Sequence, residues 1–205
     1  MKTLLLLVFL SVTARANDFL PNSFSADYEQ SFLSSVNGKT KKSFGRVDYK
    51  FPKHIRFEAV SPDPSTFVAN PRTSWFYTPP FIEGEEGTVV IQRSEDLVYT
   101  KFFDSLKNGA QSNKAYTVKF EKTNLVLKFS PALQKDLQMD QVILTTKSGL
   151  AAEAKSLGQF KSLELFHSNG KRVTLKLLSF KVNPTLAADH FEFKIPAKTK
   201  VSTGK

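Results

Sequence analysis

Apolar and polar residues alternate along most of the chain, from Phe24 to Ile195. In the first run, Phe24, Ala26 and Tyr28 alternate with polar neighbours, which is typical of a strand with one dry and one wet face. Similar runs lie at residues 47–51, 55–59, 66–69, 74–77, 88–92, 116–120, 125–129, 142–144, 163–167, 173–177 and 191–195. The pattern predicts a mainly β fold, with roughly ten strands in a single curved antiparallel sheet.

One segment, Glu95 to Lys107, has the features of a helix instead. Ser94 stands at the N-cap position, acidic residues follow in the first turn, and Asn108-Gly109 provides a stop signal. Its apolar residues cover a wide arc for a helix that is half in water, and these are Leu97, Val98, Phe102, Phe103 and Leu106. The helix is therefore expected either to plug the core or to act as a movable lid over it.

The N-terminus has the layout of a secretory signal peptide. Lys2 is followed by the apolar run from Leu4 to Leu10 and then by Ala14-Arg15-Ala16, a small-x-small cleavage site. This run is far shorter than the ~20 residues that span a bilayer. We predict a signal peptide at residues 1–16 and one domain over residues 17–205, since a chain of this length builds one sizeable core.

Composition narrows the classes of function. The chain has no cysteine, so an exported form would be held together by burial alone, and it lacks the cysteine that a lipid-anchored lipoprotein needs. Its formal charge is +10, and it remains basic without the predicted signal peptide. The lysines are spread over the whole chain, so we expect a solvated basic surface and no nucleic-acid partner. The last residues, Ser202–Lys205, are interpreted as a frayed polar tail.

Catalytic and metal-binding patterns do not stand out. The three histidines, His54, His167 and His190, are far apart in the sequence and have no cysteine nearby to complete a metal site. There is no nucleophile elbow, phosphate loop or paired-carboxylate motif. We therefore expect no cofactor and no enzymatic activity, and an envelope enzyme acting on lipid or cell wall is the least favoured alternative.

Nineteen phenylalanines are unusual beside one tryptophan and five tyrosines. Apolar rings in this number must line a core or a cavity. They could fill a closed core, or a strongly curved sheet could enclose more volume than its own side chains fill and so leave room for an apolar ligand.

Four motifs resemble those of one known family. Phe24–Gln30 is similar to the opening strand of the LolA family, an aromatic-x-Ala-x-aromatic-x-Gln pattern. Gly45 and then Tyr49–Phe57 resemble its second and third strands, Trp75–Pro79 its most recognisable motif, and Phe191–Pro196 its last strand. The matches keep the order of the family and span most of the chain.

The resemblance implies an incomplete antiparallel β-barrel whose concave apolar face is covered by helices. It also implies a periplasmic carrier, acting as a monomer, that takes acylated lipoproteins from an inner-membrane ABC transporter (LolCDE-like) and passes them to an outer-membrane receptor (LolB-like). A related sensor module that binds lipid or lipoproteins in the cell envelope is the alternative. The family often has an arginine before the strand-two proline where this chain has Phe51, and the segment before Phe24 is short and contains Pro21.

On this basis we hypothesise which residues form the site. The residues expected to line the lipid-binding cavity are Tyr49, Phe51, Ile55, Phe57, Phe67, Trp75 and Tyr77. The residues expected to form the lid helix are Leu97, Phe102, Phe103 and Leu106. Residues of opposite parity, such as Arg56 and Phe76, are expected on the other face of the sheet.

Overall fold

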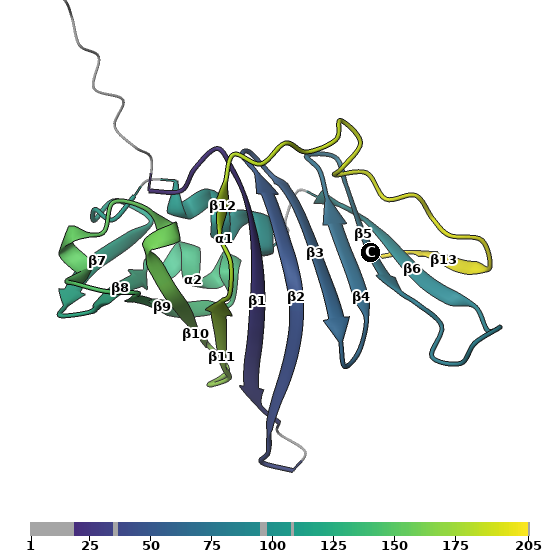
Figure 1. Ribbon diagram of the computed structural model, residues 1–205, viewed down its shortest axis with the longest axis horizontal. Coiled ribbons are helices and arrows are strands. Elements are labelled where there is room, and N and C mark those ends of the chain that lie inside the picture. Colours follow the sequence, from purple (N-terminus) through teal and green to yellow (C-terminus); the bar gives the residue numbers. More distant parts are fainter. Residues whose placement is uncertain (1–18, 35–36, 95–97, 108, 205) are drawn as a thin grey trace, which may run out of the picture.

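The computed structural model describes residues 19–34, 37–94, 98–107 and 109–204 (Figure 1). The predicted signal peptide lies outside these residues, as does Leu97. The strands are β1 (Ser23–Leu33), β2 (Thr40–Lys50), β3 (His54–Ser61), β4 (Ser65–Ala69), β5 (Thr73–Thr78), β6 (Gly87–Arg93), β7 (Tyr116–Glu121), β8 (Asn124–Phe129), β9 (Met139–Thr146), β10 (Phe160–His167), β11 (Arg172–Leu177), β12 (Lys181–Val182) and β13 (Thr199–Thr203).

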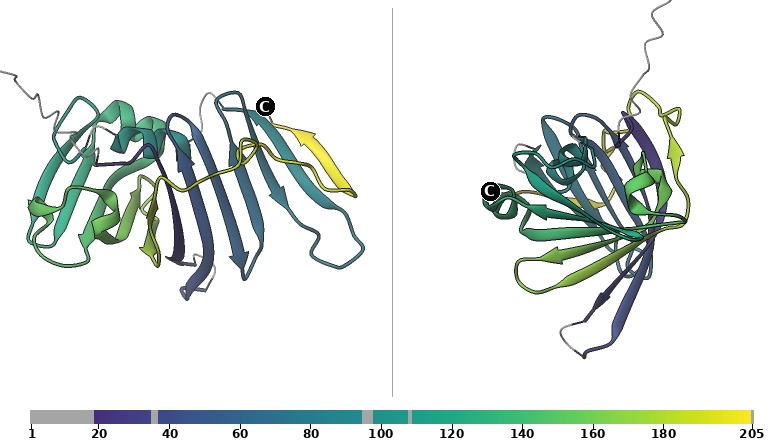
Figure 2. Two further views of the ribbon diagram at one scale, coloured as in Figure 1. Left: turned by 45° about the horizontal axis from the view of Figure 1, so that its top comes forward. Right: turned by 90° about the vertical axis from the view of Figure 1, so that its left-hand side faces the viewer.

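All 13 strands belong to one open sheet in the order β13-β6-β5-β4-β3-β2-β1-β11-β10-β9-β8-β7, with β12 paired to β1. Every pairing is antiparallel except that of β13 with β6, which is parallel. The sheet curves without closing, as the view along its length shows (Figure 2). The predicted fold, a mainly β half-open barrel with helices on its concave side, is confirmed.

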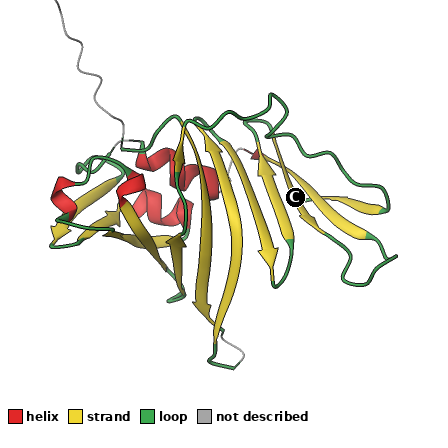
Figure 3. Cartoon of the chain, viewed as in Figure 1, coloured by secondary structure: helices red, strands yellow, loops and turns green. Residues whose placement is uncertain are grey.

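Two α-helices lie together inside the curve of the sheet (Figure 3). Helix α1 (Val98–Leu106) belongs to the predicted helical segment, of which residues 95–97 are outside the described chain, and Lys107 already lies in a turn. Helix α2 (Pro131–Leu137) is not among the elements predicted from the sequence; its N-cap Ser130 accepts a hydrogen bond from the Leu133 amide. Short 3-10 turns at η2 (Ala151–Glu153) and η3 (Leu157–Gln159) precede β10.

The core lies between these helices and the concave face of the sheet. Phe103 of α1 is the centre of an aromatic cluster, since its ring lies 5.4 Å from both Phe24 and Tyr49 and 5.1 Å from Phe102. Aromatic pairs at such distances stabilise a core beyond their area burial. The helix is therefore packed as part of the core in this conformation.

The convex face is covered in part by a C-terminal strap, residues 183–198, which crosses strands β1 to β6 (Figure 2). Beneath it, Asp48 is buried and accepts hydrogen bonds from Ser25 and Arg46, and it lies 2.9 Å from His190 Nε2 of the strap. The strap then packs Phe193 on Tyr77, with ring centroids 5.3 Å apart. These contacts cover this region of the sheet on its convex side as well.

Two predictions about the C-terminus are wrong. Residues 191–195 do not form a strand; they belong to the strap, where Phe191 and Phe193 alternate because their rings pack on His54 and Tyr77. Residues Ser202 and Thr203 do not belong to a frayed tail; they belong to β13, in which Thr199–Thr203 pairs with Gly87–Ile91. The backbone hydrogen bonds of a sheet edge do not depend on apolar side chains, so a polar segment can complete the sheet.

Candidate functional site

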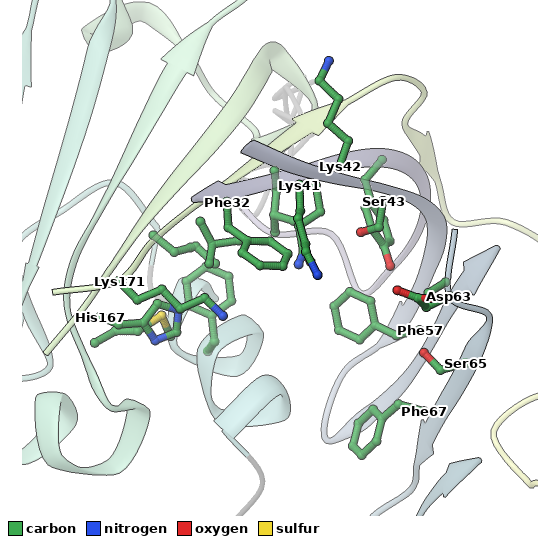
Figure 4. Close-up of a pocket in the computed structure, with 18 of the residues that line it drawn as sticks. Phe32, Lys41, Lys42, Ser43, Phe57, Asp63, Ser65, Phe67, His167 and Lys171 are labelled. Atoms are coloured by element: carbon green, nitrogen blue, oxygen red, sulfur yellow. The ribbon is translucent and has the colours of Figure 1, made fainter. Parts of the chain in front are cut away.

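A hollow of about 640 Å³ opens between the concave face of the sheet and α1 (Figure 4). Its apolar wall comes from β1, β3, β4, β5, β9, β10, β11 and α1. The wall comprises Tyr28, Phe32, Phe57, Ala59, Phe67, Phe76, Phe102, Phe103, Met139, Leu165, Val173 and Leu175. Pockets of about 300–1,000 Å³ with mostly apolar walls are typical ligand sites. The hollow is therefore large enough for an apolar ligand with the helix in its present place.

A row of three phenylalanines from neighbouring strands forms one wall of the hollow. Phe57 of β3 is opposite Phe67 of β4, and Phe67 is opposite Phe76 of β5. Residues directly opposite each other in a sheet project from the same face. Phe76 is 48% exposed, so the row continues beyond the part of the sheet that α1 covers.

The predicted cavity residues fall into three groups. Phe57 and Phe67 line the hollow. Tyr49 and Ile55 project from the same face but are fully buried beneath α1, while Phe51 lies at the β2–β3 turn and is 39% exposed. Trp75 and Tyr77 lie on the convex face, beside the strap, so the prediction that they line the hollow is wrong.

The turn between β4 and β5 explains this error. The Asn70 side chain accepts hydrogen bonds from the backbone amides of Arg72 and Thr73, and the turn aligns Ala69 with Ser74. Since side chains alternate between faces, this register places Phe76 beside Phe67 and turns the neighbouring aromatic residues outward. The strap supplies the apolar cover that they need, and its position was not visible in the sequence.

The predicted lid residues lie where the helix meets the hollow. Phe102 and Phe103 are 5% exposed and line the hollow, and Leu106 is fully buried in the core below it. The Leu97 prediction falls outside the described residues. Displacement of α1 would therefore remove two phenylalanine rings from the space next to the row Phe57–Phe67–Phe76.

Helix α1 is anchored to the sheet by Asp104. The Tyr49 hydroxyl donates a 2.6 Å hydrogen bond to its carboxylate, and the Lys53 backbone amide donates a longer one of 3.3 Å. Burial and, after it, the bond to Asp104 raise the pKa of Tyr49, so its hydroxyl stays protonated and remains a donor. This anchor occurs in a chain that has Phe51 where the family often has an arginine.

The end of α1 has a second anchor. Lys107 Nζ donates hydrogen bonds to the Leu20 carbonyl (3.0 Å) and to Asn22 Oδ1 (2.9 Å), and it lies 5.5 Å from the centre of the Phe51 ring. The short segment before β1 thus holds the end of the helix through the Leu20 carbonyl and the Asn22 side chain, and Phe51 contributes a cation–π contact.

Gly45 makes room for one wall of the hollow. A Cβ atom at this position would collide with the Glu58 carbonyl oxygen and would lie 2.6 Å from the hydroxyl of Tyr28, which lines the hollow. The Tyr28 ring lies across the glycine, which is opposite it in β2. The glycine of the family motif therefore has a packing role in this chain.

Polar residues gather at one side of the hollow. Lys41 projects from the concave face of β2, opposite Phe32, and Lys171 Nζ lies 4.6 Å from the centre of the Phe32 ring. His167 is beside them, and partial burial together with the charge of Lys171 lowers its pKa. Figure 4 shows Lys41 and Lys171 turned toward the hollow and Asp63 on the opposite side.

Several lining residues were missed as site residues although the sequence predicted their strands. Phe32, Leu165, Val173 and Leu175 continue alternating runs, so their faces were predictable. Their position beside Phe57 depends on the pairing of β1 with β11, which joins distant parts of the chain. Alternation reports the face of a residue but not the neighbour of its strand.

Within the described residues, no group of three His, Cys, Asp or Glu side chains is arranged to hold a metal ion. A search of the same residues found no helix with the length and apolar character needed to cross a membrane.

An open, curved antiparallel sheet with an apolar hollow beneath a buried helix defines the class, a half-barrel with an apolar interior. The family model of the outer membrane lipoprotein carrier protein LolA matches residues 21–194. The chain belongs to the LolA family.

Similar carrier proteins agree with this family assignment, and a solved structure shares the fold. An outer-membrane lipoprotein carrier protein of Dechloromonas aromatica is 25% identical over 203 residues, which cover 96% of this chain and 89% of that protein. One of Xanthomonas oryzae pv. oryzae is 29% identical over 167 residues, covering 78% and 73%. The crystal structure of an uncharacterised conserved protein from Thermus thermophilus covers 93% of this chain and 95% of its own, with 13% identity and a TM-score of 0.50. That likeness shows a shared fold.

Proposed function

We propose that this protein is a periplasmic carrier of lipoproteins that shields their acyl chains from water and catalyses no reaction. A signal peptide at residues 1–16 would direct export, and residues 17–205 would act as one domain and as a monomer. The carrier would receive acylated lipoproteins from an inner-membrane ABC transporter of the LolCDE type and deliver them to an outer-membrane receptor of the LolB type. The apolar hollow of about 640 Å³ carries this proposal, and membership of the LolA family supports it.

Reversible binding of the acyl chains requires that α1 and the cargo compete for the same apolar space. Burying a methylene contributes about 0.8 kcal/mol, so three acyl chains of roughly fifteen carbons would contribute about 35 kcal/mol if fully buried. That exceeds the practical limit of about 18–21 kcal/mol for non-covalent affinity, and a carrier must also release its cargo. Phe102 and Phe103 already occupy part of the apolar space, so loading exchanges one set of apolar contacts for another and stays reversible.

Release of a radiolabelled lipoprotein from spheroplasts tests the function directly. The purified mature protein should bring the lipoprotein into solution as a complex, whereas buffer or an unrelated basic protein should not. If the basic control protein releases as much lipoprotein as the mature protein does, the carrier assignment fails.

Photo-crosslinking at neighbouring positions of β5 tests the site. A photoreactive residue at Phe76, on the concave face, should capture the acyl region of the bound lipoprotein, as should one at Phe67. The matched control is Trp75, one residue away on the convex face, which should not capture it. Capture at Trp75 but not at Phe76 would place the acyl chains on the wrong side of the sheet for this proposal.

A further inference from the structure

We propose that the hollow selects acyl chains attached to an anionic group, such as a lipid phosphate or carboxylate, through a cationic rim formed by Lys41 and Lys171 with His167 beside them. The inference depends on the proposed function, because it names the chemistry of the ligand at the same site.

The rim combines charge and apolar surface in one place. Lys41 projects from β2 into the hollow, and Lys171 comes from the turn between β10 and β11. Both lysines lie beside Phe32. Lys41 is opposite Phe32 in the sheet, and Lys171 Nζ lies 4.6 Å from the centre of the Phe32 ring. An acyl chain in the hollow would thus have its polar end beside two ammonium groups.

The two ammonium groups are available for a ligand. Among the residues that the structure describes, neither Lys41 nor Lys171 forms an ion pair with a carboxylate. Lys42, the next residue in β2, also borders the hollow, but its ammonium group is paired with Glu29 at 3.0 Å. Within the described part of the chain, the carboxylate that lines the hollow is that of Asp63, on the opposite side.

His167 extends the rim on the β10 side. Its lowered pKa keeps the ring neutral at neutral pH, so it offers a hydrogen bond there without adding a third charge. An anionic group held between Lys41 and Lys171 would favour the protonated ring, and hydrogen bonds between charged groups are the stronger ones. The rim therefore distinguishes an anionic amphiphile from a neutral one with the same chain.

Displacement of a neutral fluorescent probe, N-phenyl-1-naphthylamine, from the purified mature protein tests this proposal. The competitors carry the same palmitoyl chain on different head groups: lysophosphatidylglycerol and palmitate are anionic, lysophosphatidylcholine is zwitterionic, and monopalmitoylglycerol is neutral. Two solvent-screened ion pairs correspond to about a tenfold preference, so both anionic lipids should displace the probe at about tenfold lower concentration than monopalmitoylglycerol. Added salt should reduce this preference.

The variant K41Q/K171Q should lose the preference, so that the anionic lipids and monopalmitoylglycerol displace the probe at similar concentrations. The control K128Q/K176Q removes two exposed lysines from β8 and β11, outside the hollow, and should keep it. Equal binding of all four lipids, or a preference that survives in K41Q/K171Q, overturns the rim while leaving the hollow intact. The rim is also overturned if inorganic phosphate, or an acidic peptide without an acyl chain, displaces the probe as effectively as the anionic lipids do. If no lipid displaces the probe, the proposed function fails together with the rim.

Discussion

The hydrogen bond from Tyr49 to Asp104 connects the stability of the protein to the position of α1, and the substitution Tyr49→Phe removes it alone. The ring of Tyr49 stays in the aromatic cluster with Phe24 and Phe103, so little packing is lost. A hydrogen bond to a charged group contributes about 1.5–3 kcal/mol. Asp104 keeps its bond from the Lys53 amide and some contact with solvent, so we expect the lower end of this range.

The substitution should therefore lower the free energy of unfolding by about 1.5 kcal/mol, which corresponds to a Tm lower by about 3–6 °C for a chain of this size. The affinity for lipid should increase, although the stability of the protein decreases. If α1 leaves the sheet when acyl chains enter, the bond stabilises only the ligand-free state, and its loss should tighten binding of a neutral acyl probe by up to about tenfold.

Two measurements on the same samples check this reasoning, namely denaturant unfolding and titration with the neutral acyl probe. The matched control is Tyr116→Phe, which removes the 2.6 Å hydrogen bond from another buried tyrosine to the Gly109 carbonyl, away from the hollow lining. The control should lose stability without a gain in affinity. A Tyr49→Phe protein that is less stable but binds the probe no more tightly would refute the idea that α1 and the ligand compete.

Three further predictions follow from other contacts. Gly45→Ala should lower the free energy of unfolding by about 1–3 kcal/mol, because its methyl group overlaps the Glu58 carbonyl and the Tyr28 hydroxyl; an unchanged denaturation midpoint would contradict this. The pKa of His167 measured by NMR should lie below the ordinary histidine value. Because the unfolded chain then binds more protons than the folded one, the contribution of His167 to the free energy of unfolding should decrease as pH falls below about 6.5. Asp48→Ala should speed proteolysis of the strap, residues 183–198, relative to the wild-type protein, and equal cleavage rates would show that this carboxylate does not hold it.

How much of the fold was predictable depends on how local its cause is. Alternation located the strands that form the walls of the hollow, and the apolar arc of the helical segment indicated that α1 would be buried, because both depend on nearby residues. The face of Trp75 was not predictable in this way. A strand covered on both sides carries aromatic residues at both parities, and the strap that covers the second side comes from the far end of the chain.

The cationic rim shows a second limit of prediction from the sequence. Lys41 and Lys171 are separated by most of the sequence, and they look like ordinary solvated lysines among the others of a basic chain. They come together because β1, between β2 and β11 in the sheet, joins the two halves of the chain. The motifs that resemble the LolA family predicted the fold, but a charged rim built from a strand and a distant turn has no signature in any one segment.

The parallel pairing of β13 with β6 has a consequence for how the molecule is made and handled. Without β13, the backbone groups along β6 are an open edge, and such edges invite pairing between molecules. Truncated products should therefore aggregate more readily than the finished chain. An affinity tag fused directly behind β13 would lie beside this edge strand, so a spacer between the two is the safer choice for preparing the protein.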